Sequence, residues 1–253
     1  MGASFHKTAL ITGSTRGIGL AIALRLLREA YNVVINYARD DQQAQRALIR
    51  CQQESPSVLL VQADVSRKQE VDRLVQESLR AFQRIDVLIN NAACVIDRPM
   101  QELTEEEWDR VIDTNLKGTF LCSQAVAPYM LAQETGGTIL NIGAATGIRA
   151  RKNGINTCAS KAGIMIMTQC LALELGPTIR VNTIVPGLTR TEETIQRLHL
   201  DDPEVARTRA ETIPLKRIGT PDDVADAVLL CLSPHAQFIT GQKILVDGGQ
   251  YMW

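Results

Sequence analysis

The stretch of residues 8–23 constrains the fold more than any other part of the chain, because an apolar run there ends at a glycine-rich turn and a helical pattern follows. The run at residues 8–11 is short and mostly apolar, as is typical of a strand buried on both faces. From Ile18 to Leu26 the apolar residues recur at helical spacing. The stretch therefore predicts a strand, a tight turn and a helix.

The turn between this strand and this helix contains Gly13, Gly17 and Gly19. Glycine has free backbone dihedrals and no Cβ, so an anion can approach the amide groups at a helix N-terminus. Three glycines alone can be merely a turn. Here they follow the first strand and open a helix in a chain that keeps alternating strands and helices, so the loop predicts a pyrophosphate site.

The rest of the chain shows the same alternation. Strands are expected at 32–37, 57–63, 86–90, 138–142, 179–185 and 243–246, and helices at 40–53, 67–82, 104–133, 191–211 and 221–232, with one more that begins at Lys161. This order predicts one α/β domain over residues 1–253 with a parallel sheet. The polar helical insertion at 191–211 is expected to be mobile and to form a substrate lid at about 188–215. The helix after Lys161 is apolar nearly all round, so we expect it to pack on the sheet and on another subunit.

Composition excludes several classes of partner. A net charge of −1 gives no basic footprint for nucleic acid, and no apolar run approaches the roughly 20 residues that span a membrane. Residues 1–7, MGASFHK, lack the apolar segment of a signal peptide, and the six cysteines form no CxxC pair, so we expect a cytoplasmic protein with reduced thiols. The three histidines are scattered, so no metal site is expected. Small molecules and other copies of the chain remain as partners.

The end of the second expected strand indicates which dinucleotide binds. An NAD site places an acid there for the ribose 2′-hydroxyl, and an NADP site places a cation there for the 2′-phosphate. This chain has Tyr37 in the acid's place, with Arg39 two residues later and Arg16 in the glycine loop. The pattern favours NADP(H), with NAD(H) as the alternative because Asp40 and Asp41 are close by, and two solvated arginines as the plainest reading.

Several motifs recur in the order of a known family. They are TGSTRGIG at 12–19, NYAR at 36–39, Asp64-Val65, NNAA at 90–93, Asn115, ASKAG at 159–163, RVNTIVPG at 180–187 and ITGQKILVDGG at 239–249. Together they resemble the short-chain dehydrogenase/reductase family, and within it the 3-oxoacyl-(acyl carrier protein) reductase branch. The resemblance covers essentially the whole chain. The fourth motif departs from the family, which usually ends it in glycine.

The resemblance implies a Rossmann fold: a doubly wound, seven-stranded parallel sheet in the order 3-2-1-4-5-6-7. It also implies a homodimer or homotetramer assembled through the helices that contain Asn115 and Lys161. The cofactor-binding residues that it implies are Gly13, Ser14, Arg16, Gly17, Ile18, Gly19, Tyr37, Arg39, Asp64, Val65, Asn91, Ala92, Lys161, Pro186, Gly187 and Thr191.

The catalytic residues of the family are only half retained. In the family a tyrosine delivers a proton, a serine binds the substrate oxygen, a lysine lowers the pKa of the tyrosine and holds the nicotinamide ribose, and an asparagine keeps a water relay to that lysine. Lys161 and Asn115 match the last two roles. Four residues before Lys161 stands Thr157 instead of tyrosine, and Ala144 stands where the serine is expected.

No nearby residue is an obvious replacement for the missing acid. Cys158 is three residues before Lys161 and points roughly 100° away from the tyrosine's direction, which favours a buried thiol. Thr157 is short and a far weaker acid than a phenol, and Thr146 cannot be placed from sequence. A positioned general acid is worth about 10²- to 10⁴-fold in rate, and a hydrogen-bond donor to an oxyanion about 10²- to 10³-fold. Ordinary ketone reduction is therefore predicted to be absent or very slow.

Two functional classes stay open. One is an NADP(H)-dependent redox enzyme whose substrate needs no proton donor at the tyrosine position, such as an iminium, an activated alkene or a carbonyl with its own acid. The other is an inactive NADP(H)-binding protein, either a sensor or a subunit paired with an active relative. A basic loop of Arg149, Arg151 and Lys152 suits a carboxylate, phosphate or carrier-protein substrate, or is simply solvated.

Overall fold

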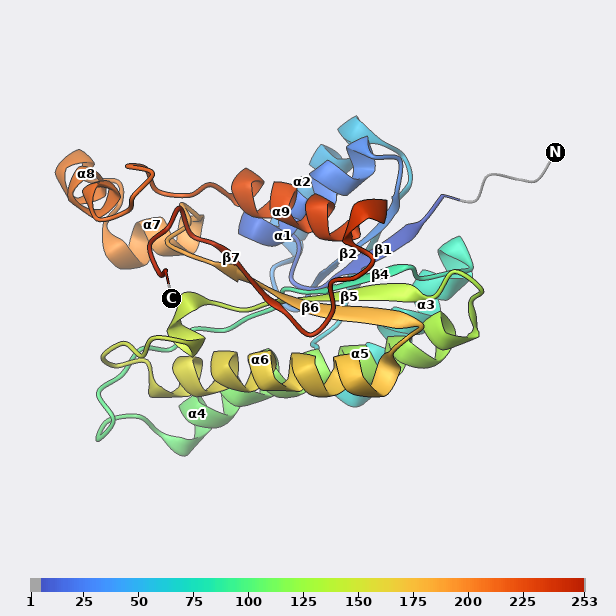
Figure 1. Ribbon diagram of the computed structural model, residues 1–253, viewed down its shortest axis with the longest axis horizontal. Helices are drawn as coiled ribbons and strands as arrows, with labels where there is room; N and C mark the ends of the chain where they lie inside the picture. The colour runs from blue at the N-terminus through green and yellow to red at the C-terminus, as the bar shows by residue number, and fades with distance from the viewer. Residues whose placement is uncertain (1–5, 253) are drawn as a thin grey trace.

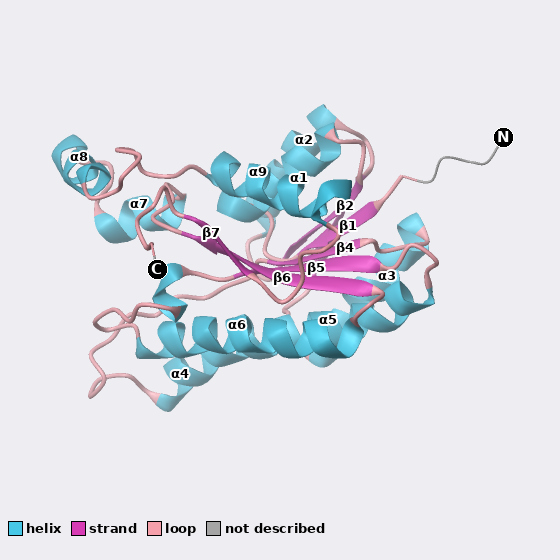
Figure 2. Cartoon of the chain, viewed as in Figure 1, coloured by secondary structure: helices cyan, strands magenta, loops and turns pink. Residues whose placement is uncertain are grey.

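The computed structural model describes residues 6–252 and has one seven-stranded sheet with helices on both faces (Figures 1 and 2). All neighbouring strands are parallel, in the order β3-β2-β1-β4-β5-β6-β7. This confirms the predicted doubly wound Rossmann fold. The strands are β1 (Thr8–Ile11), β2 (Asn32–Tyr37), β3 (Val58–Gln62), β4 (Val87–Asn90), β5 (Gly137–Ile142), β6 (Ile179–Pro186) and β7 (Lys243–Val246).

The helices divide into two layers. In Figure 1, α1, α2 and α9 lie above the sheet, and α3, α5 and α6 lie below it. The helices are α1 (Gly17–Arg28), α2 (Asp41–Glu54), α3 (Lys68–Phe82), α4 (Glu105–Ile112), α5 (Gly118–Ala132), α6 (Ile155–Leu175), α7 (Glu192–Leu198), α8 (Pro203–Glu211) and α9 (Pro221–Leu232). Short helical turns lie at η1 (Asp113–Lys117), η2 (Ala145–Gly147) and η3 (Pro234–Ala236).

Each layer of helices encloses its own hydrophobic core against the sheet. Successive side chains of a strand point to opposite faces, so β1 sends Ala9 and Ile11 into the core under α1 and α9, and Leu10 into the core over α3 and α5. All three are fully buried. This two-sided burial explains why the strands read as continuous apolar runs.

The strand order reverses between β1 and β4, which positions the site. Their register pairs Ile11 with Ile89, so the loops that follow these two strands begin side by side. In open parallel sheets, ligands bind in the crevice outside the carboxyl ends of the strands at such a reversal. The glycine loop after β1 therefore opens into this crevice.

Three predicted elements differ from the structure. Helix α6 begins at Ile155, six residues before Lys161, so Thr157 lies on the helix and not just before it. The segment 191–211 forms two separate short helices, α7 and α8, and its role as a lid stays a prediction. The long helix expected at 104–133 starts with a capping box from Thr104, but a π-helical turn at η1 interrupts it.

Helix α6 also modifies the expectation about membranes. Within residues 6–252 it is the one helix that is long and apolar enough to cross a bilayer by length and composition, with a mean hydropathy of 1.2. Core helices of globular proteins pass the same test, so one such helix is a weak indication. Most of residues 1–7, on which the expectation about a leader rested, lie outside the described part of the chain.

Candidate functional site

The glycine loop is held by side chains from the neighbouring strands. Asn36, at the end of β2, is buried, and its Oδ1 accepts a hydrogen bond of 3.1 Å from the backbone N–H of Gly13. Asn91, after β4, donates from Nδ2 to the carbonyl oxygen of Gly13 at 2.8 Å. Ser14 Oγ accepts from the N–H of Asn36 at 2.9 Å. The loop is therefore fixed from both sides of the sheet reversal before any ligand binds.

The geometry of the loop fits a dinucleotide pyrophosphate. Gly13 has a φ of +59°, and a Cβ there would lie 2.7 Å from the Cα of Ala92. At Gly19 a Cβ would lie 2.5 Å from Asn91 Nδ2. Helix α1 has no side-chain cap at Arg16 and no acidic residue in its first turn, so its N-terminal amides are left for an external anion.

The implied cofactor-binding residues gather around one cavity of about 870 Å³ that runs from the glycine loop to α6. All of them line it except Ser14 and Gly19. This volume is in the range of cofactor sites. The sequence alone assigned no role to three other lining residues, which are Asn36, Arg197 and Tyr251. Asn36 could have been suspected, since it is a polar residue within an apolar strand.

The residues at the end of β2 present cations to this cavity. Arg39 lies 69% exposed, with Nη2 3.9 Å from Asp64 Oδ2, and Arg16 is also exposed. Asp40, which could have favoured NAD(H), instead caps α2: its Oδ1 accepts from the N–H of Gln43 at 2.9 Å. The carboxylate closest in sequence to the family's acid position is thereby committed to the helix.

Asn115 sits in the π-helical turn and is fully buried. Its Oδ1 accepts from the N–H of Cys94 at 2.7 Å, and its Nδ2 donates to the carbonyl oxygen of Cys94 at 3.0 Å and to Ser160 Oγ at 3.1 Å. Asn115 does not line the cavity. Its side chain connects the loop after β4 to α6 at Ser160, the residue before Lys161.

Lys161 is buried in α6 and lines the cavity. Its Nζ donates to the carbonyl oxygen of Ile142 at 2.7 Å. Burial lowers the pKa of its ammonium group to about 8, because a charged group loses its hydration there. A lysine with this pKa exchanges its proton readily near neutral pH.

The two substituted positions lie on the same cavity as Lys161. Ala144 precedes η2, and Thr157 is one helical turn before Lys161 on the same face of α6. Thr157 Oγ1 lies 3.4 Å from Asn156 Oδ1. Thr146 lines the cavity with a buried Oγ1 that has no hydrogen-bond partner among the described residues. Cys158 does not line the cavity.

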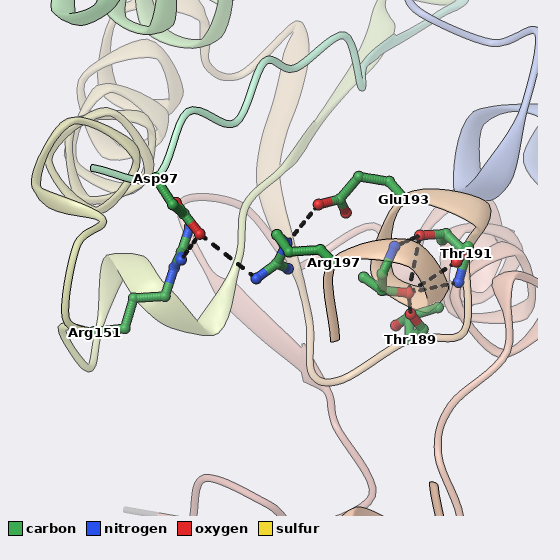
Figure 3. A network of polar contacts seen from close by, with 7 residues as sticks. Asp97, Arg151, Thr189, Thr191, Glu193 and Arg197 are labelled. Carbon is green, nitrogen blue, oxygen red and sulfur yellow. Dashed lines mark hydrogen bonds and ion pairs between the residues drawn. The ribbon is translucent and has the colours of Figure 1, made fainter. Parts of the chain in front are cut away.

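A network of charges joins α7 to the loops around the reactive end of the cavity (Figure 3). Arg151 binds the carboxylate of Asp97 with both terminal nitrogens. Arg197 of α7 lies between Asp97, at 3.8 Å, and Glu193, at 2.6 Å. Since Arg151 is paired with Asp97, an anionic substrate would have to compete with Asp97 for Arg151. Arg149 is exposed and does not line the cavity.

We expect Asp97→Asn to loosen α7. The substitution removes the one carboxylate shared by Arg151 and Arg197, and for partly exposed pairs this costs about 1 kcal/mol, or about five-fold in local opening. Hydrogen exchange of the α7 amides measures it. Glu211→Gln, which removes an exposed pair with Arg207 on α8, is the matched control and should leave α7 unchanged. Equal exchange in the two variants would contradict the role of Asp97.

Comparisons with known proteins agree with this architecture. Residues 13–250 match the family model described as enoyl-(acyl carrier protein) reductase. The chain is 40% identical over 248 residues to the 3-oxoacyl-[acyl-carrier-protein] reductase FabG of Staphylococcus epidermidis, covering 98% of this chain and all of the relative. It is 36% identical to glucose 1-dehydrogenase 2 of Bacillus subtilis, covering 98% of this chain and 95% of the relative.

Solved structures give the same result. A variant of actinorhodin polyketide ketoreductase crystallised with NADPH superposes with a TM-score of 0.92 at 32% identity, covering 99% of both chains. A short chain dehydrogenase from Bacillus anthracis superposes with a TM-score of 0.88 at 33% identity, also covering 99% of both chains. The chain belongs to the short-chain dehydrogenase/reductase family. The relatives' names span different substrates, so family membership alone does not assign one here.

Proposed function

We propose that the chain is an NADP(H)-dependent oxidoreductase with a non-standard active site. Its substrate needs no proton donor at the tyrosine position: a C=N bond, an activated C=C bond or a carbonyl that carries its own acid. The observation that carries this proposal is one cavity in which the pyrophosphate cradle and a buried Lys161 lie with Ala144 and Thr157 in place of serine and tyrosine.

The preference for NADP(H) over NAD(H) rests on charge. Arg39, just after β2, and Arg16, in the glycine loop, both line the cavity and are exposed, and Tyr37 stands where an NAD site has an acid. Asp40 caps α2 and does not compete. The related ketoreductase was crystallised with NADPH. A 2′-phosphate bound by these two arginines gains charge-assisted hydrogen bonds that a 2′-hydroxyl cannot make.

Each retained residue has a positioning role in this proposal. NADPH, when bound, supplies a hydride from its nicotinamide ring. The first-turn amides of α1 hold the pyrophosphate, and Lys161 holds the ribose next to the reacting carbon. Asn115 fixes the loop at Cys94 against α6. The lid segment at about 188–215 covers the substrate, with Arg197 attached to Asp97.

A second candidate is a catalytically inactive, NADP(H)-binding homologue that acts as a sensor or as a partner subunit. The observation that favours it is the paired replacement at positions 144 and 157, since neither Ala144 nor Thr157 can supply an acid. Retention of Lys161 in a buried, cavity-lining position favours the enzyme, because burying an amine is costly without a use for it.

The substrate is proposed to be a small molecule or a carrier-bound acyl group. An anionic group on it would approach Arg151, in exchange for Asp97. Arg149 and Lys152 lie exposed next to it, outside the cavity, and could meet a larger carrier.

We also propose assembly as a homodimer or homotetramer through α5 and α6. Both helices leave large apolar side chains exposed: Phe120 on α5, and Ile166 and Leu173 on α6. A second copy of the chain would remove them from water. All six cysteines are free thiols, which fits a reducing compartment, and we propose the cytoplasm.

The proposal is tested first by fluorescence titration of the protein with NADPH and, in parallel, with NADH. We expect micromolar binding with NADPH preferred. Protein loaded with NADPH is then incubated with cyclic imines, enones and simple ketones, and the products are identified by mass spectrometry. Binding without any product would favour the inactive homologue. No binding of either nucleotide would rule out an NADP(H)-dependent redox function.

We expect Arg39→Ala to weaken NADPH binding about 10- to 100-fold, because it removes a charge-assisted hydrogen bond worth about 1.5–3 kcal/mol. NADH binding should change by less than about two-fold, since the 2′-hydroxyl gains little from the guanidinium. Arg50→Ala removes an exposed arginine of α2 that does not line the cavity and serves as the control. An equal loss of affinity for NADPH and NADH in Arg39→Ala would contradict the assignment of Arg39 to the 2′-phosphate.

A further inference from the structure

The ammonium group of Lys161 has unused donors that face the cavity. Within residues 6–252 it makes one hydrogen bond, to the carbonyl oxygen of Ile142. An ammonium group carries three N–H donors, so two remain, one for the cofactor ribose and one for a substrate. Its side chain is only 6% exposed, and burial brings its pKa close to neutrality. A group of this kind is an acid that can be used at pH 7.

The side chains at the two substituted positions cannot replace Lys161 as proton donor. Thr157 carries only an aliphatic hydroxyl, and Ala144 carries no polar group. Cys94 lines the same cavity, but burial raises the pKa of its thiol and makes it a weaker acid. Arg110 of α4 also lines the cavity and does not lose its proton in water.

The remaining charged groups on elements packed against α6 are turned to other partners or to solvent. Asp113 and Lys117 of η1 pair with each other at the surface. Arg180 of β6 donates to the carbonyl oxygens of Cys231 and Ile239. On α4, Glu107 pairs with Arg98, and the remaining acids are exposed: Glu105, Glu106 and Asp109. Desolvation is accordingly the only cause that acts on the pKa of Lys161.

We propose that the substrate is an imine and that Lys161 itself donates the proton to its nitrogen. This inference rests on the proposed redox function, and it names the substrate class and the acid. It differs from the family pattern, in which the tyrosine delivers the proton and the lysine assists it. Thr157 is short, so the substrate nitrogen can approach Nζ through the volume that a phenol would fill.

The step balances in atoms and electrons. An N–H bond of the Lys161 ammonium breaks, and a new N–H bond forms on the imine nitrogen, which becomes an iminium while Lys161 becomes a neutral amine. NADPH, when bound, would supply the hydride that the iminium carbon accepts, and the π electron pair of the C=N bond would become the lone pair of nitrogen. The imine is reduced to an amine, NADPH is oxidised to NADP⁺, and Lys161 regains a proton from water.

The choice of an imine explains both replacements at once. Hydride transfer to a ketone builds negative charge on oxygen, which the family's serine and tyrosine stabilise. Hydride transfer to an iminium removes positive charge from nitrogen, so no oxyanion forms and no donor is required at position 144 or 157. An imine nitrogen is also far more basic than a carbonyl oxygen and accepts a proton from an ammonium group before reduction.

The test compares two substrates that differ only in their need for a proton. One is 3,4-dihydroisoquinoline, a neutral cyclic imine, and the other is its N-methyl iminium salt, which is permanently charged. Lys161→Met should lower kcat/KM for the neutral imine by about 10²- to 10⁴-fold. The same variant should lower kcat/KM for the iminium salt much less, because the iminium requires positioning but no acid. Lys161→Arg keeps a cation that does not release its proton and should behave in the same way.

A spectroscopic readout does not depend on turnover. Protein saturated with NADP⁺, which cannot reduce the ligand, is titrated with the neutral imine at pH 8. We expect the absorption band of the protonated imine to grow in wild type and not in Lys161→Met. NADPH titration and thermal unfolding show that each variant is folded and binds the cofactor.

Two results would overturn this inference. One is an equal decrease in kcat/KM for the neutral imine and for the iminium salt in folded Lys161→Met, which would leave Lys161 as a positioning residue only. The other is the same absorption band in wild type and variant. If wild type reduces neither substrate although it binds NADPH, the imine assignment fails, and reduction of an enone in the same panel would still support the proposed redox function. No reduction of any class would overturn both.

Discussion

The double variant Ala144→Ser/Thr157→Tyr is expected to gain ketone reduction. Position 157 is one turn before Lys161 on the same face of α6, and position 144 precedes η2 on the wall of the same cavity. A phenol there would meet a buried ammonium group that lowers its pKa, and a serine would add a donor to the substrate oxygen. The cavity of about 870 Å³ has room for the larger side chain.

We expect the double variant to reduce a 3-oxoacyl thioester at least about 10²-fold faster than wild type, because a general acid and an oxyanion donor together are worth more than that, although their effects are not additive. NADPH oxidation followed by product identification measures it. The two single variants are the controls, and each should gain less. A folded double variant that binds NADPH and is no faster than wild type would mean that the rest of the site is not arranged for hydride transfer.

A second large effect is expected at the glycine loop. Gly13→Ala should destabilise the protein by about 2–4 kcal/mol and abolish NADPH binding at micromolar concentrations. Gly13 has a φ of +59°, and the added methyl group would lie 2.7 Å from the Cα of Ala92, where backbone and not a mobile side chain must move. Chemical denaturation and nucleotide titration measure the two losses.

Gly17→Ala is the matched control for this prediction. Gly17 has a similar φ of +54°, but a Cβ there would meet only the side chain of Thr191, at 3.5 Å. Its cost should be limited to the backbone strain of about 1 kcal/mol. If both variants lose the same stability, the contact between the glycine loop and Ala92 does not matter, and the close packing of β1 against β4 is not what holds the loop.

The sheet and its order could be predicted because the signals that set them are local. Each strand is a short apolar run bounded by turns, and the glycine loop at Gly13 identifies the first βα unit without reference to the rest of the chain. Parallel strands joined by helices leave few arrangements of the sheet. The cofactor side of the cavity follows from the same loop.

The parts that sequence reasoning missed depend on contacts between distant residues. Helix α6 begins at Ile155 although Asn156 and Thr157 have poor helix propensity. Gly147 of η2 packs closely against this helix at Lys161, a tertiary contact that propensity does not register. Arg151 looks like a solvated cation until Asp97, 54 residues earlier, is placed beside it.

The break at Asn115 was partly predictable from local sequence and partly set by a distant contact. Asn115 has poor helix propensity, and inside a long helix such a residue suits either a backbone break or a functional amide. The structure has the break, as a π-helical turn, and the amide is used to hold Cys94. Only the three-dimensional position of Cys94, 21 residues earlier, could have indicated that partner.

A redox function without the family's acid is tested by following deuterium from the nicotinamide of NADPH into product. Protein is incubated with NADPH that carries deuterium at both C4 positions, in separate reactions with a cyclic imine, an enone or a 3-oxoacyl thioester, and the mass of each product is measured by mass spectrometry. We expect one deuterium in the amine from the imine and none detectable in the 3-hydroxyacyl product. Deuterium in no product, from protein that binds NADPH, would contradict a redox function, and rapid labelling of the thioester product would contradict the loss of the ketone-reducing acid.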